Sequence, residues 1–138
     1  MRPSKDESYM EVAKTVSHRS TCKRRHYGAV IVQDDQIIAT GYNGAPRGIP
    51  NCCDTGYCGR EGHEHNDGDY STCPAVHAEA NAIISAARRD MIGSVMYLYG
   101  EDENGNEIPA VPCPICQGLI RNAGIAKVVN EEDIHGKR

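Results

Sequence analysis

Two short segments, far apart in the chain, carry side chains of the kind that bind metals. The first contains His77-Ala-Glu79, and the second is Pro112-Cys-Pro-Ile-Cys-Gln117, with Cys113 and Cys116 three residues apart. Each segment is a weak signal alone, because Cys-x-x-Cys also occurs in redox sites and structural metal sites. Together, with each at the start of a predicted helix, they constrain the fold strongly, since the two helix N-termini must meet at one site.

The residue types favour a catalytic zinc site. Zinc prefers histidine nitrogen and cysteine sulfur, and a catalytic site keeps one position open for water. His77, Cys113 and Cys116 supply three ligands. Glu79 follows His77 by two residues, about 200° around an ideal helix, so the site must lie at the helix tip, where Glu79 is predicted to carry protons. The alternative, a thiol redox protein or a non-catalytic zinc-binding module, gives His77 and Glu79 no role.

Apolar periodicity and turn residues predict alternating helices and strands. Ser4 and Glu7 form a capping box for the first helix, and Gly124 ends the last one. The predicted helices cover residues 4–18, 76–89 and 114–122. The predicted strands cover 28–33 and 36–41, which form a hairpin, and then 94–99 and 125–129. We expect an acidic, solvated loop at 100–107 and a partly frayed polar tail at 130–138.

This order predicts a single α/β domain over residues 1–138. A helix between the two late strands favours a right-handed parallel crossover beside the antiparallel hairpin. The fold class is therefore a three-layer α/β/α domain with a mixed sheet of four to five strands. Within the helix predicted at 76–89, the apolar side chains that recur at helical spacing are expected to face the core. They are Val76, Ala80, Ile83, Ile84 and Ala87.

The formal net charge of -4 argues against a surface that tracks a polynucleotide. No apolar run approaches the length of a membrane span, and the first residues lack the apolar segment of a signal peptide. We therefore expect a cytoplasmic protein, or one of the host cytoplasm for a viral source. The seven cysteines are then better explained as metal ligands than as disulfides.

Two loops are candidates for ligand binding. Ser20 to His26 is basic, and Arg24 and Arg25 suit the oxygens of a phosphate, although a solvated charge cluster is an equal alternative. Gly41-Tyr-Asn-Gly-Ala-Pro-Arg-Gly48 has three glycines and a proline, which let the backbone approach a ligand closely. A plain irregular turn is the alternative for this second loop.

Residues 49–74 form a long polar insert that has little apolar content and needs something to hold it. A second, structural zinc with four ligands is our interpretation. The preferred ligands are Cys22, Cys52, Cys58 and Cys73, with Cys53, His63 and His65 in reserve. Free, partly buried thiols are the alternative.

With these motifs in place, the sequence resembles the deoxycytidylate (dCMP) deaminase family over about residues 8–130. The run Gly-Tyr-Asn-Gly-x-Pro-x-Gly is the most discriminating feature, because free-nucleoside and polynucleotide deaminases share the zinc motifs but lack it. The matching segments include Ser20-Thr-Cys-Lys-Arg-Arg25, Gly28-Ala-Val-Ile-Val32, Asn51-Cys-Cys53, His77-Ala-Glu-Ala-Asn-Ala-Ile83 and Asn122-Ala-Gly-Ile125. A longer loop at 100–111 departs from the family pattern.

The resemblance implies a cytidine-deaminase-like fold and zinc-dependent hydrolysis of dCMP to dUMP and ammonia, which feeds dTMP synthesis. It implies His77, Cys113 and Cys116 as zinc ligands, Glu79 as the proton carrier and Asn43 as a sugar contact. It also implies a homohexamer or other homo-oligomer, activated by dCTP and inhibited by dTTP with Mg²⁺. Control would act at the 41–48 loop, including Gly44 and Arg47, and some members bind a second zinc at positions matching Cys22 and Cys52. Another cytosine nucleotide, dCTP or a modified dCMP, is the alternative substrate.

Overall fold

A four-stranded mixed sheet forms the centre of the molecule, in the strand order β2-β1-β3-β4. The computed structural model describes residues 1–22, 24–50 and 75–136. β1 (Arg25–Gln33) pairs antiparallel with both β2 (Gln36–Tyr42) and β3 (Val95–Asp102). β4 (Lys127–Val129) pairs parallel with β3, and the helix α5 (Pro114–Ala123) lies in the connection between these two strands. The predicted hairpin and parallel crossover are confirmed.

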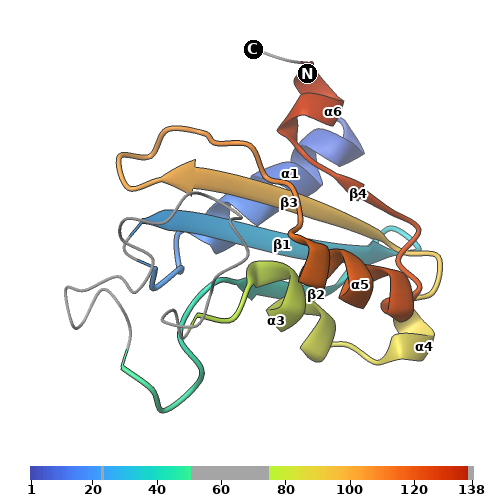
Figure 1. The fold of residues 1–138 in the computed structure, drawn as a ribbon. Helices are drawn as coiled ribbons and strands as arrows, with labels where there is room; N and C mark the ends of the chain where they lie inside the picture. Colours follow the sequence, from blue (N-terminus) through green and yellow to red (C-terminus); the bar gives the residue numbers. More distant parts are fainter. Residues whose placement is uncertain (23, 51–74, 137–138) are drawn as a thin grey trace.

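Helices cover both faces of this sheet (Figure 1). α1 (Lys5–Ser17) packs on one face, and α3 (Ala78–Ile84) and α5 pack on the other. Alternate residues of β1 serve the two cores: Ala29 and Ile31 face α3 and α5, whereas Val30 and Val32 face α1. The three-layer architecture expected from the sequence is therefore confirmed.

The capping signals in the sequence act as predicted. The Ser4 hydroxyl accepts from the Glu7 backbone N–H at 3.1 Å, and the Glu7 carboxylate accepts from the Ser4 N–H at 3.0 Å. Hydrogen bonds from the Ser4 backbone N–H and from the Ser4 side chain lower the pKa of the Glu7 carboxyl group. At the end of α5, Gly124 has φ 82° and closes the helix in the left-handed conformation.

The prediction of one continuous helix over residues 76–89 is wrong. The chain forms α3, breaks after Ser85, and resumes as α4 (Arg88–Met91). The Ser85 hydroxyl donates to the Asn81 carbonyl, which competes with helical bonding. Arg88 Nε donates to the Asn122 carbonyl at 2.8 Å, and the turn lets Met91 reach the core.

The predicted inner face of this helix is also wrong. The buried residues of α3 are Ala78, Glu79 and Ala82, whereas Ile84 is 74% exposed and Ala87 is exposed. Of the predicted stripe, Ile83 is the residue that packs against the core. Since α3 has apolar residues on both sides, periodicity alone could not choose between them.

Two segments expected to be irregular are ordered. β3 continues to Asp102 and buries Glu101, 6% exposed, which accepts a bond from the Tyr99 hydroxyl and contacts His18. Residues 131–135 form the short helix α6 (Glu131–His135). Its N-terminus has a capping box made by Asn130 and Asp133, a signal that was present in the sequence and overlooked.

We expect Gly41→Ala to lower the free energy of unfolding by about 1–3 kcal/mol, because it overpacks the contact between β2 and α3. A Cβ at Gly41 would lie 2.4 Å from both the Ala78 carbonyl oxygen and the Ala82 nitrogen. Gly118→Ala is the matched control: a Cβ there meets nothing within 4 Å, and alanine should stabilise α5 by roughly 0.5–1 kcal/mol. Urea unfolding measures both variants, and equal stability of Gly41→Ala and wild type would contradict the expectation.

Candidate active site

The structure brings His77, Cys113 and Cys116 together at the tips of two helices. His77 is the N-cap of α3 and Cys113 is the N-cap of α5, both in extended conformation. The His77 Nδ1 atom lies 3.4 Å from Cys113 Sγ and 3.3 Å from Cys116 Sγ. The ligand atoms of all three lie within 4.8 Å of one another. Within residues 1–22, 24–50 and 75–136, no other group of His, Cys, Asp and Glu is so placed.

These distances fit a tetrahedral zinc ion. Zn–S bonds of about 2.3 Å and Zn–N bonds of about 2.0–2.1 Å at a tetrahedral angle separate sulfur from nitrogen by roughly 3.6 Å. The donor set of one imidazole and two thiols is also one that zinc prefers. Among the residues that the structure describes, three supply ligands, and a site with three protein ligands and a fourth position for water or substrate is the pattern of a catalytic zinc.

The sequence around Cys113 explains why α5 begins there. Pro114 occupies the first helical position, where its missing N–H costs no helical bond. Gln117 Nε2 donates to the Pro112 carbonyl at 2.9 Å, which fixes the turn that precedes the helix. Cys116 then lies one turn along α5 and faces the same side as Cys113, as the three-residue spacing predicts.

Glu79 is buried beside the cluster, with 5% of its surface exposed. Burial raises the pKa of its carboxyl group, while bonds to its own backbone and the nearby His77 oppose that effect. Burial and the Glu79 carboxylate also raise the pKa of the Cys116 thiol. A cation at the cluster is therefore needed to hold Cys116 as a thiolate at neutral pH.

Arg25 belongs to strand β1 rather than to the basic loop expected from the sequence. β3 extends further than predicted, to Asp102, and Asp102 pairs with Arg25. β1 therefore begins at Arg25, and the basic loop expected over residues 20–26 ends before it. Residues two apart on a strand share a face, so Arg25 lies on the same face as Tyr27, which packs in the core beneath α3 and α5. Arg24 precedes the strand and is half-buried.

Tyr27 is a residue that the sequence reasoning missed. Burial raises the pKa of its phenol, Arg25 beside it opposes that shift, and the Glu79 carboxylate adds to it. The ring lies against Gly100, whose absent Cβ would come within 2.5 Å of it. The alternation of Arg25, Tyr27 and Ala29 along one strand was the signal that could have found it.

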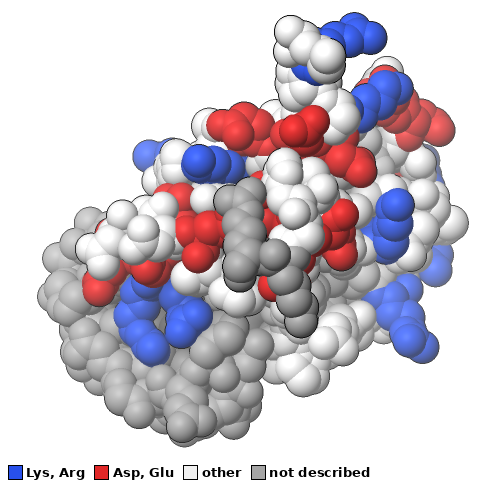
Figure 2. All heavy atoms as spheres, turned by 90° about the horizontal axis from the view of Figure 1, so that it is seen from above, with Lys and Arg blue, Asp and Glu red and all other residues white. Residues whose placement is uncertain are grey.

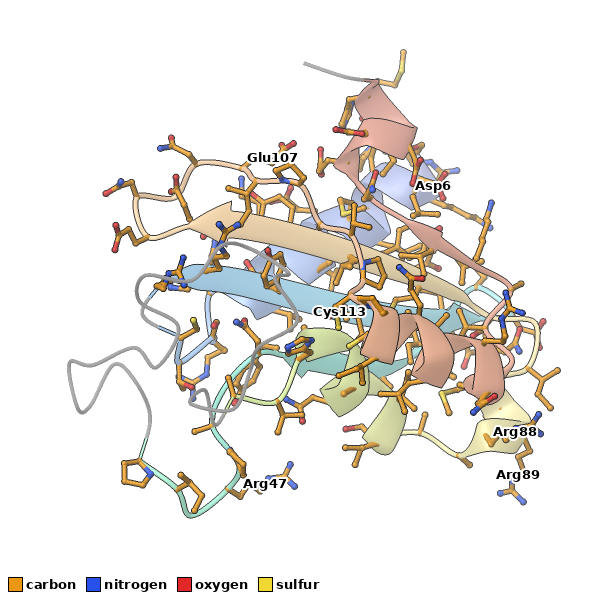
Figure 3. All side chains as sticks on the ribbon, in the orientation of Figure 1. Asp6, Arg47, Arg88, Arg89, Glu107 and Cys113 are labelled. Carbon is orange, nitrogen blue, oxygen red and sulfur yellow. The ribbon has the colours of Figure 1, made fainter. Side chains whose placement is uncertain are left out.

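The three predicted residues of the 41–48 loop lie in different environments. Asn43 is buried, and its carboxamide bonds to the backbone of Arg25 and Tyr27. Gly44 is also buried and forms an isolated antiparallel bridge with Val76, the residue before His77. Arg47 is exposed and lies away from the cluster (Figure 3).

Of the four preferred ligands for a second zinc, Cys22 is described, and its thiol is half-buried. Its sulfur accepts from the Arg24 backbone N–H at 3.4 Å. Cys52, Cys58 and Cys73, together with the reserve residues Cys53, His63 and His65, lie outside the described residues. The predicted insert at 49–74 is therefore described only at residues 49 and 50.

A cluster of one histidine and two cysteines with a buried carboxylate beside it is the arrangement of a zinc-dependent hydrolytic enzyme. The comparison with known proteins gives the family. The profile described as "Cytidine and deoxycytidylate deaminase zinc-binding region" matches residues 3–132. The chain belongs to this zinc-binding deaminase family, and Zn²⁺ is its metal.

Individual relatives agree with this assignment. The chain is 40% identical over 134 residues to the deoxycytidylate deaminase of Mycobacterium phage D29, covering 93% of this chain and 94% of the phage protein. It is 41% identical over 132 residues to the deoxycytidylate deaminase of Saccharomyces cerevisiae, covering 94% of this chain but only 38% of the longer yeast protein.

A solved structure is also similar. The dCMP deaminase of the cyanophage S-TIM5, in complex with dCMP and dUMP, matches 99% of this chain and 91% of its own with a TM-score of 0.65 and 32% identity. The predicted cytidine-deaminase-like fold is therefore confirmed. None of the helices in the described part of the chain is long and apolar enough to cross a membrane.

We expect Cys116→Ser to bind one zinc ion fewer per chain than wild type, because a serine hydroxyl is a poor replacement for a thiolate ligand. Atomic absorption on protein dialysed against metal-free buffer measures the stoichiometry. Leu119→Ser is the matched control, since Leu119 lies on the outer side of the same helix. Unchanged zinc content in Cys116→Ser would remove this residue from the site.

Proposed function

We propose that this enzyme hydrolyses dCMP to dUMP and ammonia. The observation that carries the proposal is the buried Glu79 beside a zinc-type cluster at two helix tips. A relative of nearly the same length named deoxycytidylate deaminase supports dCMP as the substrate, and so does the similar structure that holds dCMP and dUMP.

We assign His77, Cys113 and Cys116 as the zinc ligands. Zinc held there would act as a Lewis acid that lowers the pKa of a water molecule. Two thiolates and a neutral imidazole balance the charge of the ion, which suits a neutral cytosine ring as the substrate. Glu79 is not needed as a zinc ligand, so its carboxylate can act as the general acid–base group of the reaction.

Glu79 moves the protons of the reaction. Its carboxylate takes a proton from the attacking water and delivers it to the N3 atom of the cytosine ring. The water oxygen bonds to C4, which then carries a hydroxyl group and the amino group. The Glu79 carboxylate moves the proton of this hydroxyl to the amino group, and the C4–N bond breaks as ammonia leaves and the C4 carbonyl of uracil forms. Burial at 5% exposure keeps bulk water from exchanging with the carboxyl group during these two transfers.

The basic residues at the start of β1 are our candidates for the 5′-phosphate. Guanidinium groups bind phosphate oxygens with two parallel bonds. The alternation of β1 supports Arg25 on the face that carries the cluster, with Arg24 one residue outside the strand. This arrangement favours a nucleotide over a free nucleoside.

We also propose that the substrate is not a polynucleotide. Asp and Glu side chains gather over the middle of the face seen in Figure 2. Glu7, Glu11, Glu107 and Glu131 line one groove beside α1, where they outnumber Lys14 and His135. Such a surface repels the phosphate backbone of a nucleic acid.

Structural zinc, oligomer and regulation remain proposals that the family resemblance motivates. We propose that residues 1–138 form one deaminase domain. A second zinc, with Cys22 among its ligands, would hold the 49–74 insert. We also propose that the protein forms a homo-oligomer and acts in the cytoplasm. We propose dCTP and dTTP, the latter with Mg²⁺, as effectors at the 41–48 loop, with Arg47 as an exposed cation for their phosphates. The bridge between Gly44 and Val76 supports a route from that loop to His77.

Ammonia release over a panel of substrates tests the activity. The panel is dCMP, CMP, deoxycytidine, dCTP and a cytosine-containing oligonucleotide, each with and without dCTP or dTTP plus Mg²⁺. We expect turnover with dCMP alone, because Arg24 and Arg25 suit a 5′-phosphate and the relative of nearly the same length is named deoxycytidylate deaminase. Turnover confined to dCTP would favour the alternative nucleotide, and zinc binding without any turnover would favour a binding module.

We expect Glu79→Gln to keep its zinc and to lose at least 10²-fold in kcat, since loss of a general acid–base group costs about 10²–10⁴-fold. Zinc content and steady-state kinetics are measured on the same sample. Glu103→Gln, which changes an exposed carboxylate in the β3–α5 loop, is the matched control. A Glu79→Gln enzyme with wild-type kcat would remove Glu79 from the mechanism.

A further inference from the structure

Tyr27 lies on the same face of the sheet as the metal-binding cluster. It follows Arg25 by two residues in β1, so both side chains leave the strand on the face that α3 and α5 cover. The Tyr27 side chain packs against the buried core on that face and is itself half-buried. Its hydroxyl oxygen is buried. The ring is therefore part of the wall between the core and the site.

A glycine in the neighbouring strand fixes the position of this ring. Tyr27 pairs with Gly100 across β1 and β3. A Cβ at Gly100 would lie 2.5 Å from Tyr27 Cε1 and 3.2 Å from Ile108 Cγ1. The ring therefore lies directly over the glycine, with the Ile108 side chain beside it.

Ile108 reaches the ring because the chain after β3 folds back along the strand. The Ile108 N–H donates to the Gly100 carbonyl at 3.0 Å. At the turn, the Asp102 carboxylate accepts from the backbone N–H groups of Asn104 and Asn106, both at 2.9 Å. The loop that departs from the family pattern is thus held to β3 by its own hydrogen bonds, and it keeps Ile108 against the ring.

Two charged groups of the site lie beside the Tyr27 phenol. Burial raises the pKa of the phenol, a hydrogen bond with Arg25 opposes this shift, and the Glu79 carboxylate adds to it. Arg25 is our candidate for the 5′-phosphate, and Glu79 is the proton carrier at the base. The sugar of a nucleotide joins the base to the phosphate, so a side chain that neighbours both groups faces the sugar.

We propose that Tyr27 determines the choice of sugar: its ring fills the space that the 2′-hydroxyl of a ribonucleotide needs, so the site accepts dCMP and excludes CMP. A clash with the wrong substrate is an effective source of specificity, provided that the clashing group cannot move away. Gly100 and Ile108 hold the ring in place. The inference rests on the proposed function for the positions of base and phosphate, and it assigns the preference for deoxyribose to one side chain.

The test compares dCMP and CMP as substrates of Tyr27→Val and Tyr27→Phe. Valine is favoured in strands and removes the ring, whereas phenylalanine keeps the ring and removes the hydroxyl. We expect Tyr27→Val to raise the ratio of kcat/KM for CMP to kcat/KM for dCMP about tenfold, which is the discrimination that a pocket wall gives for one small group. Tyr27→Phe should keep the wild-type ratio, because the ring provides the exclusion.

Binding of the two products gives a readout that does not depend on turnover. In calorimetric titrations, Tyr27→Val should reduce the wild-type preference for dUMP over UMP about tenfold. Ile108→Ala keeps the tyrosine but removes its support, and should reduce the same preference roughly threefold. Ile108→Ala therefore carries the test if Tyr27→Val does not fold.

Tyr97→Val is the matched control, because Tyr97 lies in the same sheet on the face that α1 covers. It loses a ring of the same size and should keep the wild-type preference for deoxyribose. The proposal is overturned by an unchanged preference in Tyr27→Val, or in Ile108→Ala where Tyr27→Val does not fold. It is also overturned if Tyr27→Phe accepts CMP as well as Tyr27→Val does. Wild-type turnover of dCMP, measured alongside, tests the proposed function separately from the preference between dUMP and UMP.

Discussion

The structure depends on the meeting of three ligand atoms from two helices. Cys113 follows His77 by 36 residues, yet its sulfur lies 3.4 Å from the His77 ring. Such a contact requires α3 and α5 to begin side by side on one face of the sheet. The intervening strand β3 and its parallel partner β4 meet this requirement, because a crossover between parallel strands brings α5 back over the same face as α3.

Close packing of helix on strand fixes the position of each tip. Gly41 lets β2 approach the backbone of α3, and Gly28 lets β1 approach α1, where a Cβ would lie 2.1 Å from the Ala13 carbonyl oxygen. The buried cores on the two faces then pack the helices against the sheet. A carboxylate at 5% exposure, Glu79, is tolerated in this packing because it lies beside a site that binds a cation.

The sequence predicted the residues whose chemistry is local. The spacing of His77, Glu79, Cys113 and Cys116 placed them at helix tips, and capping residues and Gly124 placed helix ends. It failed where tertiary contacts decide. The break after Ser85 depends on Arg88 reaching the Asn122 carbonyl. The burial of Glu101 depends on a strand pairing with Arg25 to Tyr27 that no local pattern showed. Tyr27 was missed for the same reason, since its importance follows from the length of β1.

The polar residues Glu79, Asn43 and Asn81 lie either beside the metal-binding cluster or in hydrogen bonds that join elements of the fold. Glu79 lies buried beside the metal-binding cluster, whereas the Asn43 carboxamide bonds to the backbone of Arg25 and Tyr27 in β1. The Asn81 side-chain amide likewise donates a hydrogen bond to the Tyr42 carbonyl. These anchors converge on residues 42–44 but lead to different elements, Asn43 to β1 and Asn81 to α3. Separate anchors of this kind let the surroundings of β1 differ among proteins of one fold without disturbing the helix tip that carries His77.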